Sequence, residues 1–269
     1  MIDRDHARAI EAVERHAWRD LFASAPQLQA SALGLAGREV GGAFIAVATA
    51  IESYLFNRVI GLGVERPATD AGLDAIVDHY SEHGAGFEVN YCPFAGPADL
   101  PSRLRARGMD ALFHHVKWVR GVETVAPRAT TLRVERVKPR EGRAFGAIAA
   151  ETFAFGLLPA RDWLAASVGR PGWTHYLTFD GDEPAGCGAL YVEGEGAWLG
   201  WGATREAHRR KGSQTLLVAA RVRDAAAAGC RWVSTDTGPN WPDVDATSWR
   251  AMDRAAFTPA YERPCFLRA

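Results

Sequence analysis

The sequence has 269 residues, more than one typical domain of roughly 100–200 residues, so two domains are expected. Its 48% hydrophobic and 23% charged residues are ordinary for a soluble globular protein. The net charge of −1 creates no field that favours nucleic acid or an anionic membrane, so we expect neither as a partner. Residues 1–21 lack the apolar core of a signal peptide, and no run of 18 apolar residues predicts a membrane span.

The cysteines are scattered, and none forms a Cys-x-x-Cys pair. They are Cys92, Cys187, Cys230 and Cys265. This spacing gives no zinc motif, and we expect no metal. Reduced, partly buried thiols are typical of a cytoplasmic protein, which is the location we predict. The protein is expected to be a monomer or a homodimer.

The first half of the chain predicts alternating strands and helices. Strands are expected at 54–63, 86–92 and 111–120, and helices at 70–83 and 100–108. Residues 122–130 contain Pro127 and little periodicity, so they are interpreted as a linker. The predicted domains are therefore 1–125 and 126–269.

The second half has a longer and more regular order of elements. Strands are expected at 131–137, 173–179, 186–192, 197–203, 231–237 and 257–267. Helices are expected at 141–153, at 159–168, after the loop at 204–214 as far as about 228, and from a cap at Asp245 or Thr247 to 256. The order is strand, two helices, three strands, helix, strand, helix, strand.

A basic loop lies between the predicted strand 197–203 and the helix that follows. Arg209, Arg210 and Lys211 supply positive charge, and Gly212 lets the backbone approach a ligand because it has no Cβ. The first N–H groups of a helix have no partner inside the helix and lie at its positive end. The loop therefore predicts a diphosphate site, with a plain basic helix N-terminus as the alternative.

The loop fits one phosphate-binding pattern and fails two others. It contains neither G-x-x-x-x-G-K-[ST] nor G-x-G-x-x-G. It does fit R-x-x-G-x-[GAQ], with Arg209, Gly212 and Gln214, and so resembles the coenzyme A pyrophosphate loop of the Gcn5-related N-acetyltransferase (GNAT) superfamily. Thr204 and Glu206 stand where that family commonly has Val and Pro, and Gln214 replaces a small residue.

The resemblance extends over about 140 residues through the order of elements and residues 248–257, which are similar to the family's S-x-x-N-x-x-x-x-G-F segment. It implies an α/β fold of the α+β type, with a mixed, mostly antiparallel sheet flanked by helices, in two domains. The first half repeats the order of the family's second half, but residues 64–69 lack the loop pattern. A tandem protein with a degenerate first copy is the hypothesis, and an unrelated α/β cap is the alternative.

The resemblance implies that acetyl-coenzyme A lies between strands 197–204 and 231–237, which splay apart. Its pantetheine amides would take strand hydrogen bonds, its pyrophosphate would rest on the loop, and Asn240 is either an amide partner or a loop-stabilising residue. The implied binding residues are Gly202, Ala203, Thr204, Arg209, Arg210, Lys211, Gly212, Ser213, Gln214 and Asn240.

The catalytic residues are less explicit, because strand 197–203 contains no carboxylate. Asp236, at the end of the second splayed strand, is the leading candidate for the base that deprotonates an amine, with a turn-capping role as the alternative. The family's tyrosine that donates to the thiolate would fall near Met252, so Tyr261 or Ser248 is the candidate substitute. The remaining acidic and histidine candidates are weaker: Glu193 and Glu195 are interpreted as solvated turn residues, His208 as part of the loop, and His175 as either a cleft residue or a structural one.

Two functions therefore remain open. The first is acetyl-coenzyme A-dependent N-acetylation of a small-molecule amine. The second is non-catalytic binding or sensing of an acyl-coenzyme A, which the missing carboxylate and tyrosine favour. O-acylation is a third possibility that the residues do not exclude.

Overall fold

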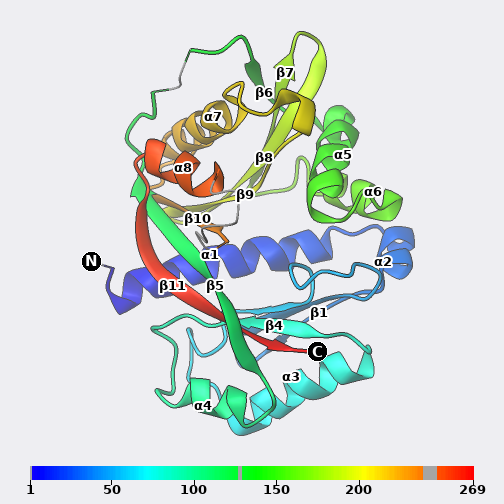
Figure 1. Ribbon diagram of the computed structural model, residues 1–269, viewed down its shortest axis with the longest axis vertical. Helices are drawn as coiled ribbons and strands as arrows, with labels where there is room; N and C mark the ends of the chain where they lie inside the picture. Colours follow the sequence, from blue (N-terminus) through cyan, green and yellow to red (C-terminus); the bar gives the residue numbers. More distant parts are fainter. Residues whose placement is uncertain (1, 127–128, 239–246) are drawn as a thin grey trace. The chain divides into compact units, whose positions relative to one another are not determined.

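A computed structural model describes residues 2–126, 129–238 and 247–269, which form two compact units (Figure 1). The first unit comprises Met1–Ala23, Ala30–Lys117 and Pro259–Ala269, and the second comprises Ser24–Gln29 and Trp118–Thr258. The chain passes from the first to the second within strand β5 (Asp110–Gly121) and returns within β11 (Thr258–Arg268). Strand β11 thus lies mostly in the first unit, although the domain boundaries predicted from the sequence place it in the second domain, 126–269.

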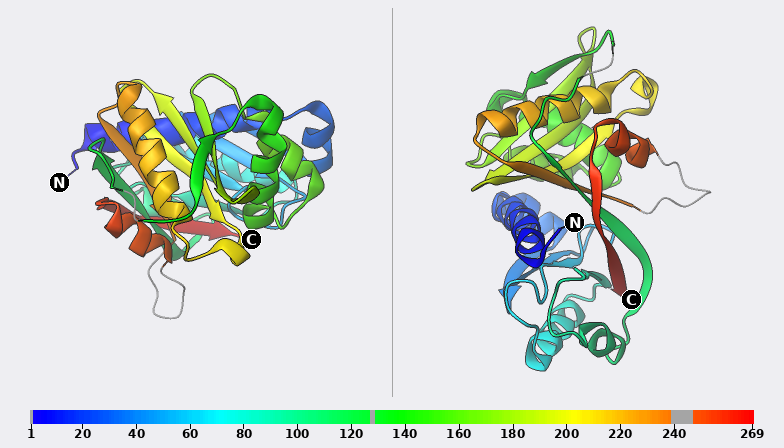
Figure 2. Two further views of the ribbon diagram at one scale, coloured as in Figure 1. Left: turned by 90° about the horizontal axis from the view of Figure 1, so that it is seen from above. Right: turned by 90° about the vertical axis from the view of Figure 1, so that its left-hand side faces the viewer.

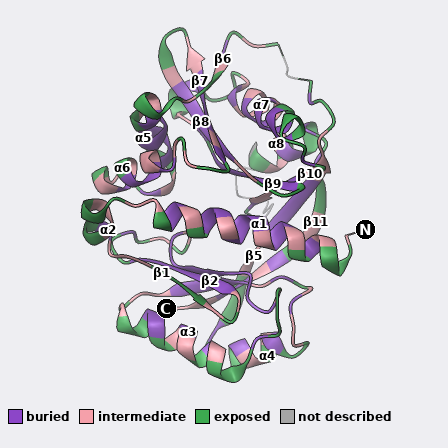
Figure 3. Ribbon diagram, turned by 180° about the vertical axis from the view of Figure 1, so that it is seen from behind, coloured by how far each residue is buried: buried purple, intermediate pink, exposed green. Residues whose placement is uncertain are grey.

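The first unit is a sheet with the strand order β1-β2-β3-β4-β11-β5. Its other elements are α1 (Arg4–Ala23), β1 (Leu35–Val40), β2 (Ala43–Ala48), β3 (Arg58–Ile60), α3 (Asp70–Glu82), β4 (Phe87–Asn90) and α4 (Leu100–Arg105), and α2 (Gln27–Leu33) begins in the second unit. Helix α1 packs on the fully buried strand β2, and its buried residues recur every three or four positions (Figure 3).

The second unit contains the strand order β10-β9-β8-β7-β6. Its elements are β6 (Arg133–Arg136), α5 (Gly142–Phe153), α6 (Leu158–Ala166), β7 (Trp173–Asp180), β8 (Glu183–Glu193), β9 (Gly196–Thr204), α7 (Ser213–Ala227), β10 (Trp232–Thr237) and α8 (Thr247–Arg254). This is the predicted order. Helices α5 and α7 both pack on β8 and β9, from opposite faces of the sheet (Figure 2).

Both units contain a helix that joins two parallel strands. In the first unit α3 connects β3 to β4, and in the second α7 connects β9 to β10. The pairs β1–β2, β2–β3, β4–β11, β6–β7, β7–β8 and β8–β9 are antiparallel. This internal similarity is what a tandem arrangement requires. Within the part of the chain that the structure describes, no helix is long and apolar enough to cross a membrane.

Candidate functional site

The basic loop between β9 and α7 has the backbone that a phosphate cradle needs. A short 3₁₀ turn, Glu206–His208, leads to two residues in the left-handed region, Arg210 with φ 65° and Gly212 with φ 95°. A Cβ on Gly212 would lie 3.3 Å from the Cβ of Thr130, whose hydroxyl donates to the carbonyl of Lys211 at 2.5 Å. Glycine is therefore required at position 212 by both its φ and its surroundings.

The loop presents a row of unused backbone donors. Among the described residues, no acceptor is bonded to the amide N–H groups of residues 210–215. The first helical bond of α7 is the one from the amide of Leu216 to the carbonyl of Gly212, at 3.1 Å. Consecutive free N–H groups at the start of a helix form an anion-binding concavity, and the three cationic residues that precede Gly212 are exposed.

The charges around this concavity fall into two groups. Lys211 and His208 are both held by Asp180, at 2.6 and 3.1 Å, and these hydrogen bonds, that of Lys211 first, lower the pKa of the Asp180 carboxyl. Arg209 and Arg210 are exposed and make no ion pair within the described residues. Asp180 therefore fixes the base of the loop, while the two arginines are available to an anionic ligand.

Strands β9 and β10, which the family resemblance expects to splay apart, pair over a short stretch only. Their parallel register covers only Gly196 to Trp198 on β9 and Trp232 to Ser234 on β10. One residue further, the hydroxyl of Thr235 donates to the carbonyl of Leu199 at 2.8 Å. Beyond this bond, as far as Thr204, β9 has no register with β10 among the described residues, so an extended ligand could pair with the strand there.

A β-bulge interrupts β9 just beyond this point, and the sequence analysis did not identify it. On β8, Cys187 pairs with Ala203 and Ala189 with Gly200, so β9 contains one extra residue. Trp201 lies in the bulge with φ 55°, a conformation that non-glycine residues rarely adopt. Its ring packs edge-on against Phe153, with centroids 5.4 Å apart. Bulges and strained residues of this kind concentrate beside functional sites, because they redirect backbone groups out of the ladder.

Arg221 supports the bulge from the interior. It is 3% exposed, and its guanidinium donates to the carbonyls of Gly200 at 3.1 Å, Ala189 at 3.3 Å and Leu217 at 3.0 Å. Burial lowers its pKa to about 10, and no carboxylate in the described residues pairs with it. Gly188 makes room for the guanidinium, since a Cβ there would lie 3.2 Å from its Cζ. The sequence offered one signal that could have identified Arg221 as a functional residue, which is its position as a charged residue on the apolar face of the predicted helix.

Gln214, which replaces the small residue of the loop pattern, lies across the end of β9. Its amide nitrogen donates to the hydroxyl of Thr204 at 3.1 Å, and its amide oxygen would be 3.1 Å from a Cβ on Gly202. The Thr204 hydroxyl in turn donates to that of Ser213 at 3.1 Å. Ser213 is buried and also shares a hydrogen bond with Thr178, at 2.8 Å. The predicted residues from 202 to 214 are thus brought together, with the Gln214 side chain over the strand edge.

The predicted catalytic residues are divided between the two units. Asp236 is half-buried near the end of β10, and Ser248 is exposed in the first turn of α8, both in the second unit. Tyr261 belongs to the first unit, where its hydroxyl donates to Glu11 at 2.8 Å. Burial, and then the Glu11 charge, raise the pKa of Tyr261 well above its ordinary value. Asn240 lies outside the described residues.

The residues that the sequence analysis set aside have structural partners. His175 is buried between Phe145 and Trp173, shares a hydrogen bond with Ser167 at 2.9 Å, and has its pKa lowered by burial to about 3. A histidine that stays neutral in this way is no proton acceptor at neutral pH. Glu193 and Glu195 are exposed at the turn between β8 and β9, as expected.

The corresponding loop of the first unit differs in its hydrogen bonds. The hydroxyl of Thr69 accepts from the amide of Gly72 at 3.1 Å and caps the start of α3. The amide of Ala68 donates to the carbonyl of Gly96 at 2.9 Å. Two of the amides around the start of α3 are thus bonded within the chain, unlike those of residues 210–215.

No protein-family model matches the chain, and no curated protein matches it in sequence. Solved structures do match it. A GCN5-related N-acetyltransferase from Kribbella flavida is 16% identical, with a TM-score of 0.61, over 90% of this chain and 92% of that one. A GCN5-related N-acetyltransferase from Sphaerobacter thermophilus is 15% identical, with a TM-score of 0.58, over 78% of this chain and 71% of that one.

A third match is a tandem GNAT protein from the clavulanic acid biosynthesis pathway. It is 18% identical, with a TM-score of 0.52, over 78% of this chain and 74% of that one. Identities this low establish similarity of fold alone, and in each case it extends across both compact units. The chain therefore has the fold of the GCN5-related N-acetyltransferases.

Proposed function

We propose that the protein is an acetyl-coenzyme A-dependent N-acetyltransferase that acts on a small-molecule amine. The observation that carries the proposal is the loop at 209–214, where the N–H groups and two exposed arginines have no acceptor or ion pair among the described residues and lie at the end of a strand that has left its register with β10. A diphosphate fits the first feature, and an extended chain of amides fits the second. Coenzyme A contains both, and proteins named as N-acetyltransferases share the fold.

The residues have separate tasks in binding. The N–H groups of residues 210–215, with Arg209 and Arg210, would hold the pyrophosphate. The edge of β9 from 202 to 204, which has no register with β10 among the described residues, would take the hydrogen bonds of the pantetheine amides. Bound acetyl-coenzyme A would supply the acyl thioester. The splayed edge would thereby gain the partners that its unpaired backbone groups lack.

The chemistry requires a proton acceptor for the amine and a donor for the developing oxyanion. Asp236, on the strand opposite the free edge, is the proposed base. The register with β8 is interrupted at the bulge, and backbone N–H groups of β9 beside it are the proposed oxyanion donors. Arg221 positions the bulge through the Gly200 carbonyl, and it is buried too deeply to be proposed as a substrate contact.

A second candidate function is binding or sensing of an acyl-coenzyme A without turnover. It is favoured by β9, which has no carboxylate, and by Met252, which is buried where the family's tyrosine would fall. The hydroxyl of Tyr261 is also engaged with Glu11 in the first unit. These observations concern the chemistry and leave the proposed binding site unchanged.

Two measurements in sequence test the proposal. Calorimetric titration of the purified chain with acetyl-coenzyme A, with dephospho-coenzyme A as a control, tests binding first. Release of free coenzyme A in the presence of a panel of small amines then tests turnover. Binding with release supports the acetyltransferase, binding without release across the panel supports the sensor, and no binding contradicts both.

A further inference from the structure

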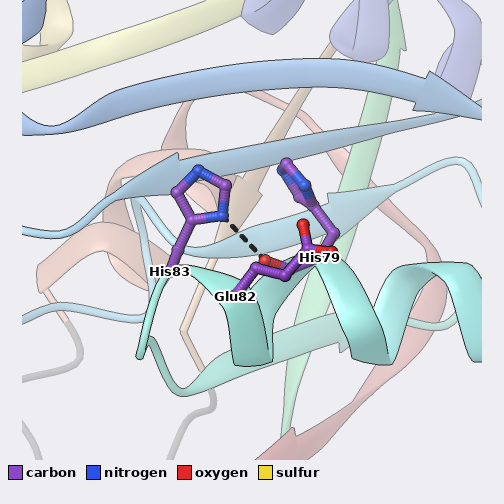
Figure 4. A group of neighbouring side chains, drawn as sticks. All are labelled: His79, Glu82 and His83. Atoms are coloured by element: carbon purple, nitrogen blue, oxygen red, sulfur yellow. Dashed lines mark hydrogen bonds between the residues drawn. The ribbon is translucent and has the colours of Figure 1, made fainter.

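Three potential metal ligands lie on one face of α3 in the first unit. His79, Glu82 and His83 are spaced i, i+3 and i+4, so their side chains leave the helix on the same side (Figure 4). Their ligand atoms lie within 4.8 Å of one another. Two histidines four residues apart on a helix face are a known arrangement for zinc. The loop of the proposed function is in the other unit, so this group is a separate feature.

His79 supplies an independent indication of a ligand. It is 6% exposed, and its Nε2 atom has no hydrogen-bond partner among the described residues. Buried polar atoms are nearly always paired, so an unpaired imidazole nitrogen requires an explanation. The ring of His83 lies close to that of His79, with centroids 4.5 Å apart and planes at 60°. The unpaired nitrogen is therefore buried beside a second imidazole.

His83 is already oriented in the way that metal-binding histidines are. Its Nδ1 lies 2.8 Å from the backbone carbonyl of His79, to which it donates (Figure 4). A ligating histidine usually donates its other ring N–H to a carbonyl or a carboxylate, which fixes the tautomer and leaves Nε2 as the ligand. The contact to the His79 carbonyl therefore selects the tautomer of His83 that can coordinate.

We propose that His79, Glu82 and His83 form a binding site for a zinc-class divalent cation, with the remaining coordination position open to water. Two imidazoles and one carboxylate suit Zn²⁺, which takes nitrogen and oxygen ligands in a tetrahedron. Glu82 is exposed, so a cation has an approach from solvent. The sequence analysis expected no metal because it considered cysteine spacing alone, and this site uses no cysteine.

Nearby charge limits the affinity. The negative charge of Glu82 attracts a cation. The positive charge of Arg38 in β1, which acts on His79, repels it. A site with three ligands and a neighbouring guanidinium should bind Zn²⁺ with a Kd on the order of micromolar, well short of closed four-ligand structural sites. Removal of the Arg38 charge should therefore tighten binding.

The test is calorimetric titration of the chelator-stripped full chain with ZnCl₂, with a chromogenic chelator as competitor. We expect one Zn²⁺ per chain for the unmodified protein, with binding at least tenfold weaker in His83→Gln and in His79→Gln. Glu82→Gln should weaken it by a smaller factor, and Arg38→Gln should tighten it. Asp78→Asn, an exposed carboxylate on the same helix, and His114→Gln in β5 are the matched controls and should bind as the unmodified chain does.

Substitution with Co²⁺ separates this site from the buried thiols. Nitrogen and oxygen ligands give ligand-field absorption without a thiolate charge-transfer band, and this spectrum is expected. A thiolate band would place the ion at a cysteine, such as the group formed by Glu88, His115 and Cys265, and would overturn the proposal. Unchanged Zn²⁺ affinity in His83→Gln would overturn it as well. His83 is only half-buried, so that variant is informative even if His79→Gln fails to fold.

Discussion

The guanidinium of Arg221 donates to the carbonyl oxygen of Gly200 at 3.1 Å, one residue before the bulge in β9. This bond joins the interior face of α7 to the strand that carries the proposed oxyanion donors. A buried cation without a carboxylate partner is costly, and here backbone carbonyls alone compensate it. The contact therefore links the packing of α7 to the geometry of the reaction site.

Arg221→Met should reduce kcat with the best acceptor by up to about 10²-fold while KM for acetyl-coenzyme A changes little, because the loop is untouched and only the bulge shifts. Arg221→Lys should retain part of the activity. Steady-state kinetics measure both constants. Arg223→Met, an exposed neighbour on α7, is the control. An equal loss in that variant would remove the positioning role.

Gly212→Asp should abolish measurable binding of acetyl-coenzyme A. The new side chain meets Thr130 and places negative charge at the phosphate cradle, in a backbone conformation with φ 95°. The backbone strain alone should cost about 1–2 kcal/mol of stability. Gly194→Asp is the matched control, since its φ is also positive, at 57°, and nothing lies within 4 Å. Calorimetry on both variants checks the prediction, which fails if Gly212→Asp binds normally.

Gln214→Ala should tighten binding of acetyl-coenzyme A about three- to tenfold, because it removes the side chain that covers Gly202 and restores the small residue of the loop pattern. Gln214→Glu should weaken binding, because it adds negative charge beside the pyrophosphate position. Titration of the two variants gives the comparison. Weaker binding in Gln214→Ala would show that the native amide contacts the ligand.

The first unit should lose stability as the pH falls below about 4.5, because Glu14 is ionised in its interior. Burial acts to raise the pKa of Glu14, but Arg263, Lys117 and Arg58 outweigh it and hold the pKa below the ordinary 4.5. The stabilisation is therefore complete above the pKa of the unfolded chain and is lost as the pH falls toward the folded value. Urea denaturation between pH 3 and pH 7 measures this.

Glu14→Gln tests the same network at neutral pH. It removes the carboxylate that lies 2.5 Å from Nζ of Lys117 and 2.7 Å from the Arg263 guanidinium, which keeps its longer contact to Glu11 at 3.4 Å. Breaking a buried pair from one side costs about 3–5 kcal/mol. Glu39→Gln, which breaks the exposed pair with Arg19, should cost less than about 1 kcal/mol. Similar losses of unfolding free energy in Glu14→Gln and Glu39→Gln would show that burial does not determine how strongly these ion pairs stabilise the protein.

Local signals determined most of the second half of the chain. The pattern at 209–214 identified the loop, because free helix N–H groups, adjacent cations and a required glycine are properties of consecutive residues. Regular apolar spacing gave the helices and strands from β6 to β11 in their observed order. The elements of the first half were predicted less accurately. Residues 54–63 were predicted as one strand, but only Arg58–Ile60 form β3, because Asn57 closes the preceding turn onto Ala48 and Ile51.

Tertiary structure alone decided the rest. Helix α1 was not predicted, and its buried face includes Glu11 and Glu14, whose charges are balanced by partners between 44 and more than 200 positions away. The bulge at Trp201 depends on the register of β8, and the buried role of Arg221 depends on carbonyls of two strands. The return of Pro259–Ala269 to the first unit depends on pairing with β4. Each of these features depends on contacts between residues far apart in the sequence, whereas a sequence pattern gives information only about residues close together in the chain.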